Sequence, residues 1–200
     1  NPIFRGAATA LVTPLNENGI DYVELERLIN WQIEQGIDAL VIAGTTGEGS
    51  TLTDEEHREV LRFTVEQVNG RVPVIAGTGS NDTDYAVSLS RYACEVGCDA
   101  LLLVTPYYNK ATQKGLIKMF TSIADASAIP IILYNVPSRT GCNILPATAA
   151  ALCREVPNIV GIKDKEAVEM LVGIVSSDLV DKIFKRVTLG ALVGIIVFVN

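Results

Sequence analysis

A lysine closes one of the apolar strands that the sequence predicts. Lys163 follows residues 159–162, which read Ile-Val-Gly-Ile, so its ammonium group would be partly withdrawn from water. Withdrawal from water disfavours the charged form, which lowers the pKa of the side chain and increases the share of free amine. A free amine can attack a carbonyl carbon and form a Schiff base. The simpler interpretation is a lysine whose stem lies along the strand while its tip reaches water.

A second segment has the composition of an anion site. Residues 44–47 read Gly-Thr-Thr-Gly and follow another apolar run. The glycines let the backbone turn and expose its N–H groups, and the hydroxyls of Thr45 and Thr46 add donors, so the segment would suit a carboxylate or a phosphate. An ordinary turn between a strand and a helix has the same composition.

Two further groups follow a later apolar run. Tyr134 ends that run, and Arg139 comes after a turn that contains proline. A phenol can relay a proton when a neighbour holds it, and the planar guanidinium group of arginine can grip a carboxylate. A tyrosine of the core and an arginine of the surface are the structural alternatives. Tyr107 and Tyr108 follow yet another run, where packing is the simpler role.

The elements that must position these groups alternate along the chain. Short apolar runs, most of them without polar alternation, are typical of strands buried on both faces; they cover residues 6–13, 38–43, 72–77, 99–104, 130–135, 158–163 and 193–199. Between them, amphipathic patterns predict helices over residues 21–35, 53–68, 83–95, 112–126, 146–155 and 166–176. The second of these helices opens with a capping box, Thr-Asp-Glu-Glu.

This alternation predicts repeated βα units, and therefore either a barrel or a doubly wound sheet. The sequence contains neither a G-x-G-x-x-G nor a phosphate-binding-loop motif, which favours a (β/α)8 TIM barrel made of residues 1–200 as one domain. The carboxyl ends of barrel strands form one rim that carries the active site. The four segments described above all follow strands, so they would converge there, although 200 residues is short for a fold that typically takes about 250.

Composition excludes several other classes of function. The net charge is −7 and no basic run is present, which argues against nucleic-acid binding. The most apolar run, residues 187–199, is shorter than the ~20 residues of a membrane span, and no leader is visible.

His57 is the only histidine, which excludes a metal site of several histidines. Its charged neighbours predict a surface or interface position. Four cysteines without a C-x-x-C pair indicate reduced thiols in the cytoplasm.

Together, these segments resemble the dihydrodipicolinate synthase family of pyruvate-dependent class I aldolases, which belongs to the N-acetylneuraminate lyase superfamily. The matching residues are 44–48 (Gly-Thr-Thr-Gly-Glu), 77–81 (Gly-Thr-Gly-Ser-Asn), 105–110 (Thr-Pro-Tyr-Tyr-Asn-Lys), 134–141 (Tyr-Asn-Val-Pro-Ser-Arg-Thr-Gly) and 161–163 (Gly-Ile-Lys). The resemblance runs in order through the chain as far as Lys163, and the segment 134–141 is its most specific part.

The resemblance implies a pyruvate site. Lys163 would form an imine with pyruvate, and Thr45 and Thr46 would bind the pyruvate carboxylate, with Gly47 beside them. Ile195 would help to line the same pocket. No metal or organic cofactor would be required.

The resemblance also implies a proton relay and a site for a second substrate. Tyr134 would shuttle protons together with Thr45 or Thr46 and with Tyr108, which in the family reaches in from an adjoining subunit, so the active unit would be a dimer or tetramer. Arg139 would anchor the carboxylate of L-aspartate 4-semialdehyde. The implied activity is that of a lyase of lysine and diaminopimelate biosynthesis, which condenses this aldehyde with pyruvate to 4-hydroxy-tetrahydrodipicolinate.

The chain departs from the family pattern after Lys163. Residues 164–167 read Asp-Lys-Glu-Ala, and residues 164–200 are divergent or truncated: the barrel looks shortened after the sixth strand and lacks the family's C-terminal helical region. Residues 190–200 resemble the last barrel strand. Tyr85 stands where members that lysine inhibits often carry an acidic residue, which predicts weak or no inhibition. Two alternatives remain, namely another sugar-acid aldolase of the family and an inactive barrel fragment that acts as a binding protein.

Overall fold

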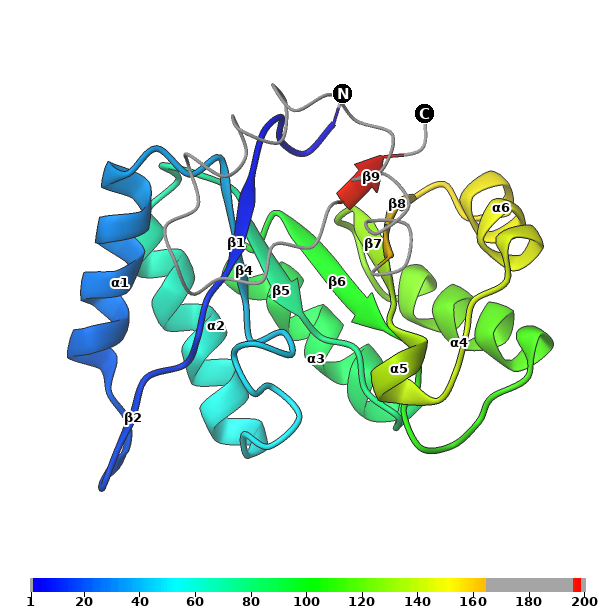
Figure 1. The fold of residues 1–200 in the computed structure, drawn as a ribbon, viewed down its shortest axis with the longest axis horizontal. Helices are drawn as coiled ribbons and strands as arrows, with labels where there is room; N and C mark the ends of the chain where they lie inside the picture. The colour runs from blue at the N-terminus through cyan, green and yellow to red at the C-terminus, as the bar shows by residue number, and fades with distance from the viewer. Residues whose placement is uncertain (1, 165–195, 199–200) are drawn as a thin grey trace.

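A curved sheet with helices along one side makes up the fold (Figure 1). The computed structural model describes residues 2–164 and 196–198. The sheet has the strand order β1-β4-β5-β6-β7-β8-β9, and neighbouring strands pair in parallel from β1 to β8. Its strands are β1 Ala8–Ala10, β4 Ala39–Ile42, β5 Val74–Gly77, β6 Ala100–Val104, β7 Ile131–Asn135, β8 Ile159–Asp164 and β9 Ile196–Phe198.

The central strands are apolar and buried over nearly their whole length. Every residue of β4, β5 and β7 is buried, which explains why these segments lack polar alternation. Each parallel pair is linked by a helix: α1 Tyr22–Glu34, α2 Asp54–Val68, α3 Thr83–Val96, α4 Gln113–Asp125 and α6 Pro146–Glu155. The predicted βα repeat is therefore confirmed from β1 to β8.

Alternate residues of the strands enter two separate cores. One core contains Leu40, Leu101 and Leu133 together with the apolar faces of the helices. The other contains their strand neighbours Val41 and Leu102, packs against the N-terminal segment, and includes no residue of a helix among those the structure describes. A doubly wound sheet would have helices on both faces, so this division confirms the predicted TIM-barrel class, with the second core on the inner face.

Capping residues determine where each helix begins and ends, and thus where the chain turns back to the sheet. Thr53 and Glu56 form the predicted capping box at the start of α2, in which each side chain accepts a hydrogen bond from the other residue's backbone. Asp21, Asp82 and Thr112 cap α1, α3 and α4, each with a side chain that accepts a hydrogen bond from a backbone N–H of the first turn. Gly97 ends α3 in the left-handed conformation, with φ at 92°, where glycine is favoured.

Two small elements were not predicted from the sequence. A hairpin pairs β2 Leu15–Asn16 with β3 Gly19–Ile20 through a two-residue turn, Glu17-Asn18. The helix α5 Pro137–Thr140 takes the place of a plain turn after β7. Proline at its first position is compatible with a helix start, because no backbone hydrogen bond is lost there.

The predicted strand over residues 193–199 is confirmed in part, by β9. Its interpretation as the last strand of a parallel barrel is wrong, because β9 pairs antiparallel with β8, with Lys163 opposite Ile196. The open edge of β8 presents N–H and C=O groups that a strand of either direction can satisfy. The predicted helix over residues 166–176 lies outside the described residues. None of the described helices is long and apolar enough to cross a membrane.

Candidate active site

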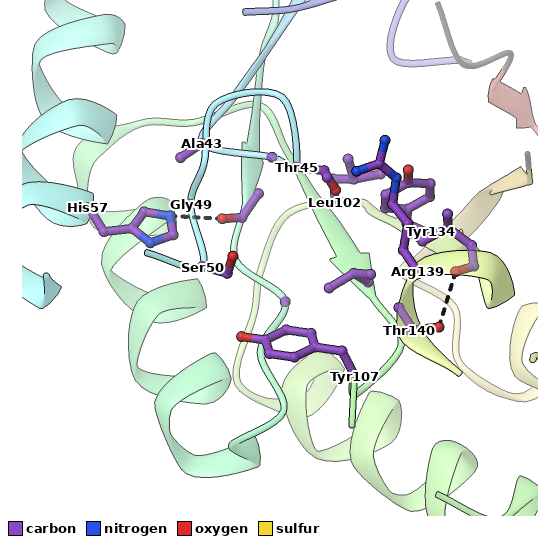
Figure 2. A pocket seen from close by; sticks show the side chains of 15 residues that line it. Ala43, Thr45, Gly49, Ser50, His57, Leu102, Tyr107, Tyr134, Arg139 and Thr140 are labelled. Carbon is purple, nitrogen blue, oxygen red and sulfur yellow. Dashed lines mark hydrogen bonds between the residues drawn. The ribbon is translucent and has the colours of Figure 1, made fainter. Parts of the chain in front are cut away.

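A cavity of about 380 Å³ opens where the parallel strands end (Figure 2). Residues at the end of β4, β5, β6 and β7 or just after it line the cavity, including Thr45, Gly79, Tyr107, Tyr134 and Arg139. Three of the four segments predicted to converge, those after β4, β6 and β7, therefore line one cavity, whereas Lys163 of the fourth is not one of the lining residues. A cavity with mostly apolar walls and a few convergent polar groups is the usual form of a small-molecule site.

Tyr134 lines the cavity, and Lys163, which is not one of the lining residues, lies directly beside Tyr134. They are directly paired across β7 and β8, and the ammonium nitrogen of Lys163 lies 4.6 Å from the centre of the Tyr134 ring. Burial lowers the pKa of Lys163 from the ordinary 10.5, because the charged form loses its hydration. Lys163 is therefore a half-buried amine against a buried ring.

The loop after β4 is built around the backbone of Ala43. Ala43 has a φ of 51°, a left-handed conformation that costs strain energy in a residue with a side chain. Gly49 and Gly77 pack so tightly on it that a Cβ on either would lie 2.1 or 2.5 Å from the Ala43 carbonyl oxygen. Thr13 adds a hydrogen bond of 2.7 Å to the carbonyl oxygen of Gly47. The loop is therefore held in place from three sides.

This loop presents the predicted anion-binding groups. Thr45 is exposed and lines the cavity, whereas Thr46 is half-buried beside it and Gly47 is buried. Within the described part of the chain, the backbone N–H groups of Thr45 and Thr46 donate no hydrogen bond, although the carbonyl oxygen of Thr45 accepts one from Glu48. These donors are available for a carboxylate.

Arg139 lies on α5, directly after β7. The hydroxyl of Thr140 fixes this short helix, since it accepts a hydrogen bond from Thr105 and donates to the carbonyl oxygen of Val136 or Cys142. Gly141 ends the helix with φ at 67°. Figure 2 shows the Arg139 side chain extending over Tyr134 toward the side of the cavity that carries Thr45. The guanidinium group is exposed at the cavity mouth, as a clamp for an incoming carboxylate would be.

The two tyrosines after β6 separate in the structure. Tyr107 is half-buried and lines the cavity, whereas Tyr108 is 89% exposed and has a left-handed backbone with φ at 73°. Its backbone N–H donates to the carbonyl oxygen of Thr140 over 3.2 Å, which anchors this conformation to α5. Tyr108 thus points away from the core, and packing within the chain does not explain it.

Among the described residues, no hydrogen bond joins the Tyr134 hydroxyl to Thr45, Thr46 or Tyr108. The proton relay that the resemblance implies therefore stays a prediction. Ile195 lies outside the described residues. The described part of the chain also holds no cluster of three or more histidine, cysteine, aspartate or glutamate side chains that could bind a metal ion.

Comparison with known proteins shows to which family this chain belongs. A sequence profile of the Dihydrodipicolinate synthetase family matches residues 3–184. The chain belongs to this family. Its resemblance to dihydrodipicolinate synthases, which rests on the segments around the cavity, is therefore confirmed.

Curated relatives in the family carry one name. The chain is 61% identical over 163 residues to the 4-hydroxy-tetrahydrodipicolinate synthase of Acetivibrio thermocellus, a match that covers 82% of this chain and 56% of the relative. It is 60% identical to that of Lachnoclostridium phytofermentans, over 81% of this chain and 55% of the relative. The chain thus spans about half the length of the curated relatives it matches.

Solved structures of the family superpose on the fold. The dihydrodipicolinate synthase of Acinetobacter baumannii, described as chloride-inhibited and complexed with pyruvate, matches with a TM-score of 0.79 and 46% identity, over 90% of this chain and 61% of that one. The synthase of Thermotoga maritima matches with a TM-score of 0.80 and 39% identity, over 92% of this chain and 60% of that one.

Sequence reasoning misplaced one residue of the site. His57 was expected at a surface or interface, but it is 3% exposed and lines the cavity, and its Nε2 lies 2.9 Å from the carbonyl oxygen of Gly77. Burial lowers the pKa of His57 below 6.5. The charged residues around it occupy the other faces of α2, and a helical wheel of α2 could have placed His57 with the buried Val60, Leu61 and Thr64.

Proposed function

We propose that this chain carries the catalytic groups of a 4-hydroxy-tetrahydrodipicolinate synthase, which condenses pyruvate with L-aspartate 4-semialdehyde in lysine and diaminopimelate biosynthesis. The observation that carries the proposal is the pairing of Lys163 with Tyr134 across two strands, at a distance of 4.6 Å, with Tyr134 lining the same cavity as Thr45. The names of the relatives and their identities of up to 61% support the choice of substrates.

The proposed chemistry begins at Lys163. Its free amine adds to the ketone carbon of pyruvate, and loss of one water molecule gives the imine. The N–H groups and hydroxyls of Thr45 and Thr46 hold the pyruvate carboxylate, which aims the ketone at the amine. Tyr134 carries protons to and from the reacting oxygen and nitrogen. The chemistry needs neither a metal nor an organic cofactor.

The second half of the reaction uses Arg139. The imine loses a proton from the methyl group, and the resulting enamine carbon attacks the aldehyde carbon, so a carbon–carbon bond forms and the aldehyde oxygen takes up a proton. Arg139 binds the carboxylate of the aldehyde substrate meanwhile. The amino group of that substrate then attacks the imine carbon, which closes the ring and releases Lys163 as a free amine.

Assembly and location complete the proposal. The exposed Tyr108 reaches the active site of a second copy, so the working unit is a homodimer or a tetramer of such dimers. The four cysteines are free thiols within the described residues, which supports a reducing compartment, the cytoplasm.

The pyruvate step is tested by reductive trapping. Borohydride with pyruvate should add one reduced pyruvate to the chain, and peptide mapping should place it on Lys163. Lys163→Ala should abolish the adduct, whereas Lys118→Ala, which removes an exposed lysine of α4, should leave it unchanged. An adduct on another residue would refute the proposed nucleophile, and the absence of any adduct would favour the inactive binding protein.

The second substrate is tested by a coupled assay with different aldehydes. We expect turnover with aspartate semialdehyde and little with sugar-derived aldehydes, because Arg139 offers a clamp for a carboxylate at the cavity mouth. Turnover only with a sugar-derived aldehyde would instead identify the chain as a sugar-acid aldolase of the family.

A further inference from the structure

A buried amide at the end of β7 bonds to two segments next to the site. Asn135 directly follows Tyr134 and is 3% exposed. Its side chain makes three hydrogen bonds, to Asn143, Asp164 and Ile144. Both amide hydrogens and the carbonyl oxygen are therefore used. Because a buried polar group without a partner is costly, this side chain is held in one orientation.

The first hydrogen bond reaches the strand that carries Lys163. Asn135 Nδ2 donates to Asp164 Oδ2 over 3.0 Å. Asp164 directly follows Lys163, and the register pairs it with Asn135 just as it pairs Lys163 with Tyr134. The bond thus fixes the end of β8, one residue beyond the proposed nucleophile.

The other two hydrogen bonds reach the loop behind Arg139. Asn135 Nδ2 donates to Asn143 Oδ1 over 2.8 Å, and Asn135 Oδ1 accepts from the backbone N–H of Ile144 over 2.9 Å. This loop, residues 141–145, directly follows α5, so its position sets where Arg139 lies.

Gln113 of α4 holds the same loop from the opposite side. It donates to the carbonyl oxygen of Asn143 over 2.8 Å and accepts from the N–H of Leu145 over 3.1 Å. Asn135 and Gln113 therefore share one loop, but within the described part of the chain only the Asn135 side chain also bonds to β8. This difference separates the two roles experimentally.

We propose that Asn135 is a positioning residue that links the strand of Lys163 to the loop behind Arg139, so that one buried side chain sets the geometry of both substrate sites. The inference rests on the proposed function for the roles of Lys163 and Arg139. An amide is the group that fits: an aspartate here would place a carboxylate against the Asp164 carboxylate and would lack the hydrogens that both oxygen partners accept.

The test compares Asn135→Ala with Gln113→Ala. Asn135→Ala should slow reductive trapping at saturating pyruvate by about ten- to a hundredfold, because small displacements of a nucleophile are costly, and should raise the KM for the aldehyde. Gln113→Ala should raise only that KM and keep trapping within about twofold of wild type. Unchanged trapping in Asn135→Ala, or an equal loss in both variants, would overturn the proposal.

Variants of Asp164 keep the test valid if Asn135→Ala folds poorly. Asp164→Asn keeps an oxygen that accepts from Asn135, so its trapping rate should stay within about twofold of wild type. Asp164→Ala should be as slow as Asn135→Ala, and the double variant no slower than either single one, because both remove the same link. Effects that simply multiply in the double variant would show two independent roles and contradict the proposal.

Failure of the proposed function has a different signature. If wild-type chain gives no pyruvate adduct on Lys163, the proposed function is refuted and this inference falls with it. If wild type gives the adduct and the Asn135 and Asp164 variants trap pyruvate equally fast, only the link through Asn135 is wrong.

Discussion

Lys163 combines two properties that an amine nucleophile needs, a free electron pair and a fixed direction. Burial supplies the first, because it lowers the pKa of the ammonium group from 10.5. The Tyr134 ring at 4.6 Å supplies part of the second. The face of a tyrosine ring also attracts a cation, which favours the protonated form. The Tyr134 ring would therefore partly oppose the lowering of the Lys163 pKa by burial.

The pH dependence of trapping follows from this pKa. The rate of adduct formation with pyruvate should rise with pH as Lys163 loses its proton, and it should level off above the pKa of the folded protein. We expect the midpoint to lie below 10.5, measured by intact mass after short exposures to cyanoborohydride between about pH 6 and about pH 11.5. N-acetyl-lysine amide, treated identically, is the control, and a midpoint for the protein that is not lower than that of the control would contradict the assigned burial.

At the scale of elements, α2 is held to the sheet through His57. Its Nε2 contacts the Gly77 carbonyl oxygen at the end of β5, and its Nδ1 is buried without a hydrogen-bond partner in the described structure. Burial lowers the pKa of His57 from 6.5, so the folded protein binds this proton more weakly than the unfolded chain does. The free energy of unfolding should therefore fall as the pH drops below about 6.5, and this contribution should level off below the pKa of the folded state.

His57→Gln tests this coupling between α2 and β5. Glutamine does not titrate but can still donate to the Gly77 carbonyl oxygen. We expect the loss of stability between about pH 7.5 and about pH 5.5 to be smaller in the variant, by up to about 1.4 kcal/mol for each pH unit. Urea unfolding at both pH values measures it, and carboxylates common to both proteins cancel in the difference. An equal loss in both proteins would show that His57 is not the titrating group.

The elements differ in how well the sequence predicts them. Apolar runs place the strands β4 to β8, because a strand buried on both faces needs apolar residues throughout, and the groups after these strands converge for the same topological reason. The direction of β9 was not predictable, since an open strand edge accepts either direction. His57 was misplaced because its sequence neighbours are charged, although neighbours in sequence lie on different faces of a helix. The role inferred for Asn135 depends on partners at 143, 144 and 164, which only the fold brings together.

At the scale of the whole molecule, the exposure of Tyr108 is the basis for the proposal that one chain does not complete a site. A tyrosine that is 89% exposed and held at a φ of 73° is costly for an isolated chain, because the backbone is strained and a large ring lies in water. Insertion into a second copy would bury this ring, and a two-fold arrangement would make the exchange mutual.

Mixed dimers test this exchange. A dimer of one Lys163→Ala chain and one Tyr108→Phe chain, isolated with two affinity tags, should have about half the activity of the wild-type dimer, because one of its two sites is complete. A dimer of a wild-type chain and a chain with both substitutions should be nearly inactive. The opposite ranking of the two dimers would show that Tyr108 serves the site of its own chain.

The close packing of Gly49 and Gly77 on the Ala43 carbonyl has a consequence for how this site can diversify. The loop takes its shape from backbone atoms in contact with backbone atoms, so the scaffold of the proposed anion site is independent of the side chains it displays. In a saturation-mutagenesis library, variants of the two glycines should therefore fail to fold. Variants of Thr45 should fold and should differ in which substrates they accept. Substitutions at Thr45 can therefore change substrate selectivity while the backbone of the loop stays the same.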